Sequence, residues 1–146
     1  TVTVEGGVVI DCTALHETSD AAAWVEVHGA EADPDGATAV VYKAVNAQLR
    51  SQHGFTYTPG QTVVAPDWRQ ADECGFGLHF GATPHHADAY YGLPDVRFLA
   101  CRITLAEAIG ITGRWDTPKI KARSCVVLHE VDRAGRPLIA AVGARS

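Results

Sequence analysis

The chain has 146 residues, of which 47% are hydrophobic and 20% charged, and this balance excludes a disordered segment, which would be poorer in apolar residues. No apolar run approaches the roughly 20 residues that a membrane-spanning helix needs, and no signal peptide is recognisable, so we expect a soluble intracellular protein with no membrane partner. The net charge is −5, from 12 Lys plus Arg against 17 Asp plus Glu. Because nucleic-acid binding through phosphates normally needs a basic surface, nucleic acid is not an expected partner.

The beginning of the chain predicts a β-hairpin and then a helix. Residues 1–10 carry β-branched residues on both sides of two glycines, which is typical of a tight hairpin turn. Ser19-Asp20 is a helix cap before Ala21–His28, and Gly29 is a stop signal. The acidic, turn-rich stretch 31–36 is then the expected boundary between an N-terminal appendage, residues 1–36, and a main domain, residues 37–146.

The main domain is expected to consist mostly of strands joined by turns. The β-prone segments are 39–45, 55–58, 61–65, 78–80, 96–103, 119–131 and 138–142. Short helices are expected at 84–91, after the cap Thr83, and at 105–109. Regular alternation of strands and helices is absent, so the prediction is an α+β fold with a curved, mostly antiparallel sheet, three short helices and the hairpin-helix appendage.

The segment from Cys74 to Pro84 contains the densest group of residues that could bind a ligand. Gly75 and Gly77 allow unusual backbone torsions and the close approach of a ligand, and His79 lies on the strand that follows. A capped helix then begins, whose N-terminal amides could receive an anion. An ordinary glycine-rich turn that leads into a strand is the alternative, and the sequence leaves both open.

Metal binding is not predicted. The cysteines Cys12, Cys74, Cys101 and Cys125 are far apart in the sequence and no Cys-x-x-Cys occurs, so we expect reduced thiols buried in the core. Cys125 and His129 share one face of a predicted strand, but that spacing is about 13 Å, too far for a common zinc ion. His85 and His86 are adjacent on a helix, and a solvated helix face accounts for them.

A period of two along residues 119–131 places basic side chains on one face. Lys119, Lys121 and Arg123 lie on the side that also carries Cys125, Val127 and His129, whereas the other side is expected to face the core. Lys121 and Arg123 could bind a phosphate or carboxylate. An ordinary solvated edge strand is the alternative.

The order of four segments resembles a known but uncharacterised domain. Val41–Val45, Phe55–Gly60, Glu73–Phe80 and Lys119–Cys125 occur in the succession found in a domain of phage and actinobacterial proteins, including phage rIIB-like proteins. The resemblance covers about residues 39–132, and Cys-Gly-x-Gly-Leu-His is its specific element. It implies a compact β-rich module of unassigned activity and a phage or prophage origin, hence a host cytoplasm or a virion as the location.

A more distant resemblance links residues 77–90 to the ADP-ribosyltransferases of the poly(ADP-ribose) polymerase type. In those enzymes an early strand carries a residue that holds NAD, a Gly-aromatic segment and a tyrosine contact the nicotinamide, and a late strand supplies a glutamate. The resemblance implies Lys43, His79 and Glu130 as catalytic residues, with Tyr90 among the residues that bind the ligand. Lys43 and His79 are not the residues usual in that family.

Two functions therefore follow as expectations. The first is a phage-derived accessory or binding module that acts through protein contacts, with a protein partner or a homo-oligomer and no cofactor. The alternative is an ADP-ribosyltransferase-like domain that binds NAD or another nucleotide, with Lys43, His79 and Glu130 in one cleft.

Overall fold

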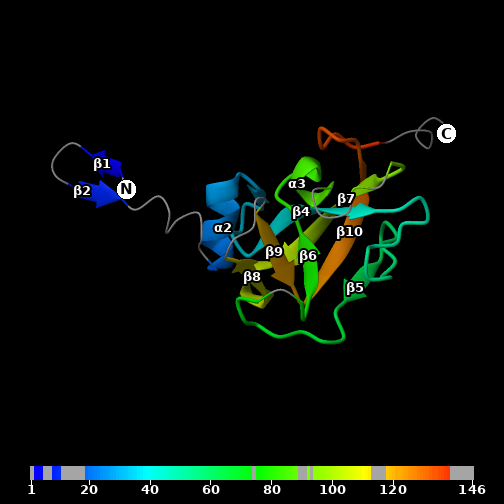
Figure 1. Cartoon of the computed structure of the whole chain (residues 1–146), viewed down its shortest axis with the longest axis horizontal. Helices are drawn as coiled ribbons and strands as arrows, with labels where there is room; N and C mark the ends of the chain where they lie inside the picture. Colours follow the sequence, from blue (N-terminus) through cyan, green and yellow to red (C-terminus); the bar gives the residue numbers. More distant parts are fainter. Residues whose placement is uncertain are drawn as a thin grey trace.

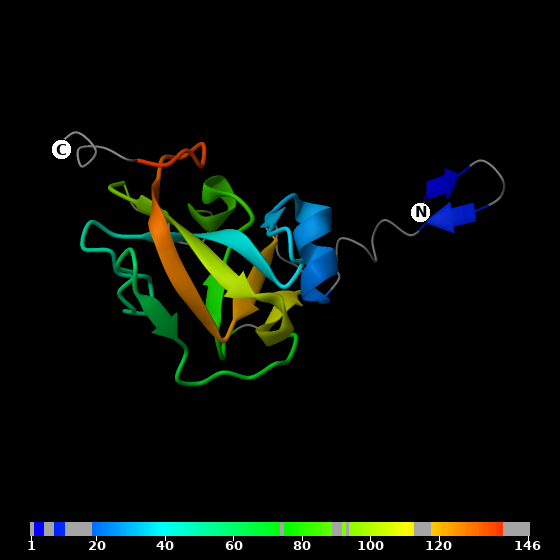
Figure 2. The ribbon, with the colours of Figure 1, turned by 180° about the vertical axis from the view of Figure 1, so that it is seen from behind.

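The computed structural model describes residues 2–4, 8–10, 19–73, 75–88, 92, 94–112 and 118–138, the first two stretches as backbone only. The main body contains two antiparallel sheets that face one another, as Figures 1 and 2 show from opposite sides. The fold is therefore α+β and mostly β, with two separate sheets in place of the expected single curved one. No helix in the described part of the chain is long and apolar enough to cross a membrane.

The larger sheet has five strands in the order β3-β4-β7-β10-β5. These are β3 (Glu31–Ala32), β4 (Thr38–Val45), β7 (Arg97–Thr104), β10 (Ser124–Val131) and β5 (Thr62–Val64). The runs rich in Val, Ile and Ala at β4 and β7 pair over their full lengths, from Thr38 with Thr104 to Val45 with Arg97. A register shift between Val127 and His129 interrupts the pairing of β10 with β7.

The smaller sheet has three strands in the order β6-β9-β8. These are β6 (Leu78–Phe80), β9 (Lys119–Ala122) and β8 (Ala108–Ile111). Leu78, Phe80 and Ile120 belong to the same buried cluster as Val41 and Leu99 of the larger sheet, so the main core lies between the two sheets. Residues 42 and 81 form a bridge that joins the larger sheet to the end of β6.

The helix α2 begins and ends where the sequence predicts, and α3 begins at the expected residue. In α2 (Ala21–His28), the Asp20 side chain accepts a hydrogen bond from the Ala23 amide at 2.9 Å, and Gly29 ends the helix with φ of 75°. The hydroxyl of Thr83 accepts from the His86 amide in α3 (Pro84–Asp88). The third expected helix is a single 3₁₀ turn, η1 (Leu105–Glu107).

The helix α2 is part of the core and not of an appendage. Trp24 is 1% exposed and belongs, with Ala21 and Val25, to the main hydrophobic cluster. The strand β3 pairs with β4 in the larger sheet. The turn at residues 31–36 therefore lies within the body, while the expected hairpin is present as β1 (Val2–Val4) paired with β2 (Val8–Ile10).

The predicted long strand 119–131 is wrong in one respect, because the chain changes sheets at Arg123. β9 ends at Ala122 in the smaller sheet, and β10 begins at Ser124 in the larger one. The two sheets face each other across the core, so the side of the chain that faces the core reverses at this corner. Consequently Cys125 and Val127 are buried in the core, whereas Val126, expected to face it, is 42% exposed.

The cysteines and the segment 55–58 differ in how well the sequence predicts them. Cys101 and Cys125 are free, buried thiols, as expected, while Cys12 and Cys74 lie outside the described residues. Residues 55–58 contribute only an isolated bridge between Arg50 and Thr56 and not the expected strand.

We expect Trp24→Ala to destabilise the whole domain by about 3–5 kcal/mol, the usual cost of truncating a fully buried aromatic side chain. Urea unfolding followed by circular dichroism measures this change, with Glu26→Ala, an exposed position on the same helix, as the control. A main unfolding transition that stays at the wild-type midpoint in Trp24→Ala would show that α2 is dispensable for the core.

Candidate functional site

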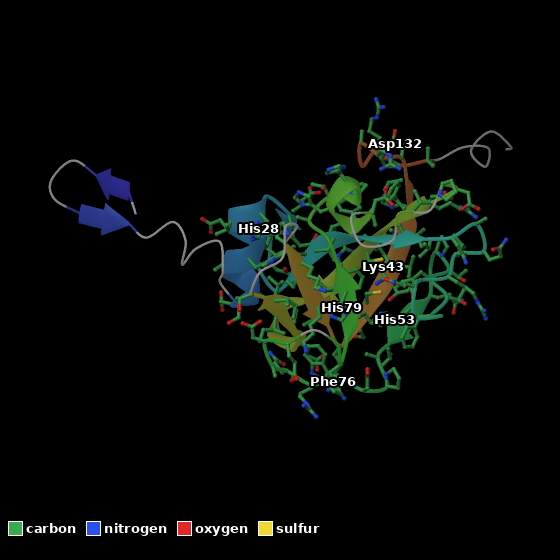
Figure 3. The ribbon with its side chains drawn as sticks, in the orientation of Figure 1. His28, Lys43, His53, Phe76, His79 and Asp132 are labelled. Carbon is green, nitrogen blue, oxygen red and sulfur yellow. The ribbon has the colours of Figure 1, made fainter. Side chains whose placement is uncertain are left out.

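A cavity of about 210 Å³ lies where the smaller sheet meets the larger one. Its wall comes from β4, from the irregular segment 51–57, from Asp67 and from the loop and strand at 75–79. The lining side chains and backbone belong to Lys43, Ser51, His53, Phe55, Tyr57, Asp67, Gly75, Phe76, Gly77, Leu78 and His79. In Figure 3, Lys43, His53 and His79 lie near the middle of the body and Phe76 at its lower end.

The glycine loop before β6 has a backbone that few residues can adopt. Gly75 has φ of 88° and Phe76, a bulky residue, has φ of 54°. A positive φ at such a side chain is uncommon and is held only when the surroundings fix it. Here Arg69 supplies two of the contacts: its amide donates to the Phe76 carbonyl at 3.0 Å, and its guanidinium lies 4.2 Å from the centre of the Phe76 ring.

Lys121 and His79 hold the same loop from the side of the smaller sheet. Lys121 is fully buried, and its Nζ donates to the Gly75 carbonyl at 3.1 Å. The Gly75 amide donates to Nε2 of His79 at 3.2 Å. Lys121 and His79 are direct cross-strand neighbours in β9 and β6, so the pairing of these strands positions both groups.

Lys43 approaches the loop from the opposite side. A period of two along β4 puts Lys43 on the face that carries Val41 and Val45, toward the core. Its Nζ donates to the His79 carbonyl at 2.7 Å and lies 5.5 Å from the centre of the Tyr57 ring and 5.6 Å from that of Phe80. Burial lowers the pKa of Lys43 to about 8.

His79 is held as a neutral imidazole. Because Nε2 accepts a hydrogen bond, the ring proton lies on Nδ1. Burial, together with the charges of Lys43, Lys119 and Lys121, lowers the pKa of His79 to about 3. The imidazole is therefore a hydrogen-bond partner without charge throughout the physiological pH range.

These lysines are the only ones in the sequence, and the other cationic side chains are arginines. Lys119 and Lys121 are 7% and 0% exposed, and Lys43 is half-buried. An acidic protein thus gathers its lysine charge around one histidine, whereas its arginines carry the surface ion pairs, such as Arg102 with Asp33. The expectation of a solvated edge strand is wrong for Lys119 and Lys121, because β9 is the central strand of its sheet.

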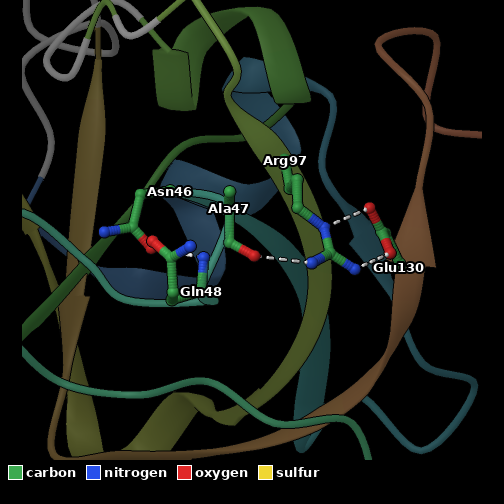
Figure 4. A network of polar contacts seen from close by, with 5 residues as sticks. All are labelled: Asn46, Ala47, Gln48, Arg97 and Glu130. Atoms are coloured by element: carbon green, nitrogen blue, oxygen red, sulfur yellow. Dashed lines mark hydrogen bonds and ion pairs between the residues drawn. The ribbon is translucent and has the colours of Figure 1, made fainter.

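Glu130, the third residue of the expected catalytic set, is engaged elsewhere. Its two carboxylate oxygens accept from Nε and Nη2 of Arg97 at 2.9 and 2.7 Å, and Nη1 of Arg97 donates to the Ala47 carbonyl, as Figure 4 shows. This bidentate ion pair holds the pKa of Glu130 below its ordinary value. The structure therefore brings Lys43 and His79 together at the cavity, and Glu130 is not among the residues that line it.

Of the other residues that the sequence suggested for ligand binding, some line the cavity and others lie away from it. Gly75 and Gly77 line the cavity. Lys121 lies behind the loop, and Arg123 is exposed at the corner between the sheets, where it pairs with Glu107 at 3.2 Å. Tyr90 lies outside the described residues.

Sequence reasoning missed the side chains that come from irregular segments. Tyr57 is 0% exposed, lines the cavity, and has a hydroxyl without a hydrogen-bond partner among the described residues. His53 and Asp67 line the cavity from exposed positions. The sequence does contain one indication of the site, because all its lysines lie at residue 43 and at residues 119–121. Among the described residues no group of three His, Cys, Asp or Glu side chains could hold a metal.

We expect His79→Gln to weaken the acid sensitivity of folding. The pKa of His79 is about 3 in the folded state and 6.5 is its ordinary value, so between these values the unfolded chain binds the extra proton and stability falls as pH falls. From pH 6.5 to about pH 5 the wild type should lose about 1–2 kcal/mol through this group, and His79→Gln should lose correspondingly less. Urea titrations at each pH measure the difference. His129→Gln, an exposed histidine, should behave like the wild type, and identical pH profiles for all three proteins would contradict the assignment.

The Trp68 ring occupies the space that a side chain at Gly77 would need. A Cβ at residue 77 would lie 2.9 Å from two carbons of the Trp68 ring and 3.3 Å from the Ala122 carbonyl. Gly77→Ala should therefore cost about 1–3 kcal/mol through overpacking, and not through a left-handed backbone. Thermal unfolding tests this. Trp68→Leu in the same chain should recover part of the loss, and strictly additive effects would exclude the collision.

The comparisons with known proteins give a family but no activity. No curated protein and no solved structure matches the chain. The model of DUF7666, described as a domain of unknown function, matches residues 39–136, which agrees with the resemblance to an uncharacterised domain over residues 39–132. The match runs from β4 to the turn after β10, and so includes both sheets from β4 onward and the whole lining of the cavity. The chain therefore belongs to the DUF7666 family.

Proposed function

We propose that this domain binds a small anionic molecule, a carboxylate or a phosphate, in the cavity beside Lys43. The observation that supports this most is the position of Lys43: the residue lines the cavity, and among the described residues its ammonium forms no ion pair with a carboxylate. A desolvated cation without a counter-charge is costly, and an anionic ligand offsets that cost.

The surroundings of Lys43 strengthen the preference for an anion. Lys119 and Lys121 are close enough to lower the pKa of His79, so their charges also reach the adjacent cavity. Two unit charges at 4 Å interact by about 4 kcal/mol at the effective dielectric constant of a protein surface, which is enough to select the sign of a ligand. His79 adds no negative charge, and its Nδ1–H has no other acceptor among the described residues.

The size of the cavity limits the ligand. A volume of about 210 Å³ is smaller than the roughly 300–1,000 Å³ typical of pockets for drug-sized ligands. A short acid or a single ring fits this space, whereas a whole dinucleotide does not. Under the alternative of NAD binding, only the nicotinamide ring or one phosphate would enter, and Phe55 and Phe76 offer the aromatic surfaces for ring stacking.

Binding without group transfer is the form of the NAD alternative that the geometry supports. A transferase would need a free carboxylate beside the reacting carbon. Glu130 is instead neutralised by Arg97 at 2.7 Å, outside the cavity lining. We therefore assign no catalytic role to Glu130.

Protein contacts are a second candidate, supported by a different observation. Val64 and Val126 are 56% and 42% exposed, and their strands are neighbours at the β5 edge of the larger sheet. A partner that covers these valines suits an accessory or binding module that acts through protein contacts, the first of the two expected functions. Pairing of a partner strand with β5 would use the free edge of that strand.

Ligand-observed NMR with pyruvate, nicotinate, AMP and NAD tests the anion site. At least one of these should bind at millimolar concentration or tighter at pH 7, and Lys43→Met should weaken that binding about tenfold or more. Arg123→Gln, which removes an exposed cation at the corner between the sheets, is the matched control and should bind normally. Failure of all four ligands to bind the wild type, or equal binding by Lys43→Met, would contradict the proposal.

The pH dependence of that affinity gives a second, independent test. An anion prefers protonated Lys43, whose pKa is about 8, so the affinity should fall by about tenfold for each pH unit above that value. In His53→Gln, which removes the other histidine of the cavity, the affinity should stay constant between pH 5 and 7, since His79 does not titrate there. An affinity that decreases between pH 5 and 7 would mean that His79 carries the charge that binds the ligand.

A further inference from the structure

The environment of Lys43 is that of a reactive amine as well as of a binding cation. Its Nζ has one hydrogen-bond acceptor among the described residues, the His79 carbonyl at 2.7 Å, and is flanked by the rings of Tyr57 and Phe80. Lys119 adds a like charge, which further favours the neutral amine. A lysine that is desolvated in an apolar pocket and close to other cations is the usual form of a lysine nucleophile.

We propose that Lys43 forms a reversible imine with a small 2-oxo acid or aldehyde acid bound in the cavity. This inference rests on the proposed anion site, because the carboxylate of the ligand is what brings the carbonyl to Lys43. It goes further in assigning the ligand a carbonyl group and Lys43 a covalent role.

The reaction balances without an oxidant or a reductant. The Nζ lone pair attacks the carbonyl carbon and a C–N bond forms. The carbonyl oxygen then takes two of the three ammonium protons and leaves as water, so that the ammonium and the carbonyl yield a protonated imine and one water molecule. Nζ gives up one proton before it attacks and is positively charged again in the protonated imine, which restores the attraction for the ligand carboxylate.

Other groups of the cavity are suited to the accompanying steps. The Tyr57 hydroxyl is buried without a partner and, since burial raises its pKa, remains a hydrogen-bond donor. With Nδ1–H of His79 it can bind the ligand carboxylate while Lys43 is occupied with the carbonyl. His53 and Asp67 are exposed and line the same cavity, so they can exchange protons between the reacting oxygen and the solvent.

The volume and the charge of the cavity select the ligand class. About 210 Å³ holds a short oxo acid such as pyruvate or glyoxylate, and the field of the lysines favours the carboxylate over a neutral aldehyde. Because the pKa of Lys43 is about 8, its neutral fraction at pH 8 exceeds that of an ordinary lysine by on the order of a hundredfold.

Reductive trapping of the full chain tests the inference. The protein is incubated with glyoxylate or pyruvate and cyanoborohydride at pH 8, and the adduct is located by intact mass and peptide mapping. An adduct at Lys43 is expected that forms on the order of tenfold faster, or more, than any at Lys119 or Lys121, because Lys43 lines the cavity and those two lysines do not. The same reaction in urea is the matched control, since all lysines of the unfolded chain should then react alike. Propanal, which lacks the carboxylate, should label Lys43 more slowly than glyoxylate does.

The outcomes separate this inference from the proposed function. Binding of pyruvate by ligand-observed NMR without trapping at Lys43 would overturn the imine and leave the anion site intact. Labelling that is as fast at Lys119 or Lys121 as at Lys43 would also overturn it. Absence of both binding and trapping would overturn the two proposals together. The wild-type peptide map decides among these outcomes even if Lys43→Arg, which should give no adduct at residue 43, does not fold.

Discussion

The burial of lysine charge against a single glycine loop is the constraint on which the candidate site depends. Lys121 donates to the Gly75 carbonyl from one side, and Lys43 donates to the His79 carbonyl from the other. Hydrogen bonds from charged donors contribute about 1.5–3 kcal/mol each, but they do not neutralise the charge. The backbone of the loop and of β6 therefore keeps two cations in place beside a cavity, and the same field keeps His79 neutral. The left-handed torsions of Gly75 and Phe76 are the geometry that these contacts fix.

The arrangement connects stability and ligand binding. The acidic surface of the protein is balanced by arginines in exposed ion pairs, and these contribute little to binding or folding. The lysine cluster is the exception, because its charge is held away from water and next to an open volume. An anion in the cavity would offset the desolvation of Lys43 and stabilise the fold. The ion pair of Glu130 with Arg97 leaves this field intact, because the carboxylate is not among the groups at the cavity.

Much of the local structure, and half of the site, follows from the sequence. The cap at Asp20, the stop at Gly29 and the β-prone runs of β4 and β7 follow from local chemistry, and the glycine pattern before His79 indicated the loop correctly. The change of sheet at Arg123 could not be predicted from the sequence, because the alternation of side chains continues without a break from β9 into β10. Only the position of the opposing sheet decides which side of the chain faces the core. Tyr57 and His53 lie on irregular backbone, where no periodic pattern of side chains indicates which residues face the cavity. The pairing of Arg97 with Glu130 depends on the register of β7 with β10, which is a tertiary property.

The titration of His79 is the decisive measurement on the lysine cluster, because this imidazole reports the charge of the lysines around it. Nitrogen-detected histidine NMR from pH 8 to about pH 4, assigned with His79→Gln, follows its protonation state and tautomer. We expect one imidazole that stays neutral with its proton on Nδ1 over this range, since the pKa of His79 is about 3. A His79 signal that titrates near the ordinary value of 6.5 would mean that the ring is neither buried nor surrounded by the lysine charges, and that the lysines do not form a charged cluster around it.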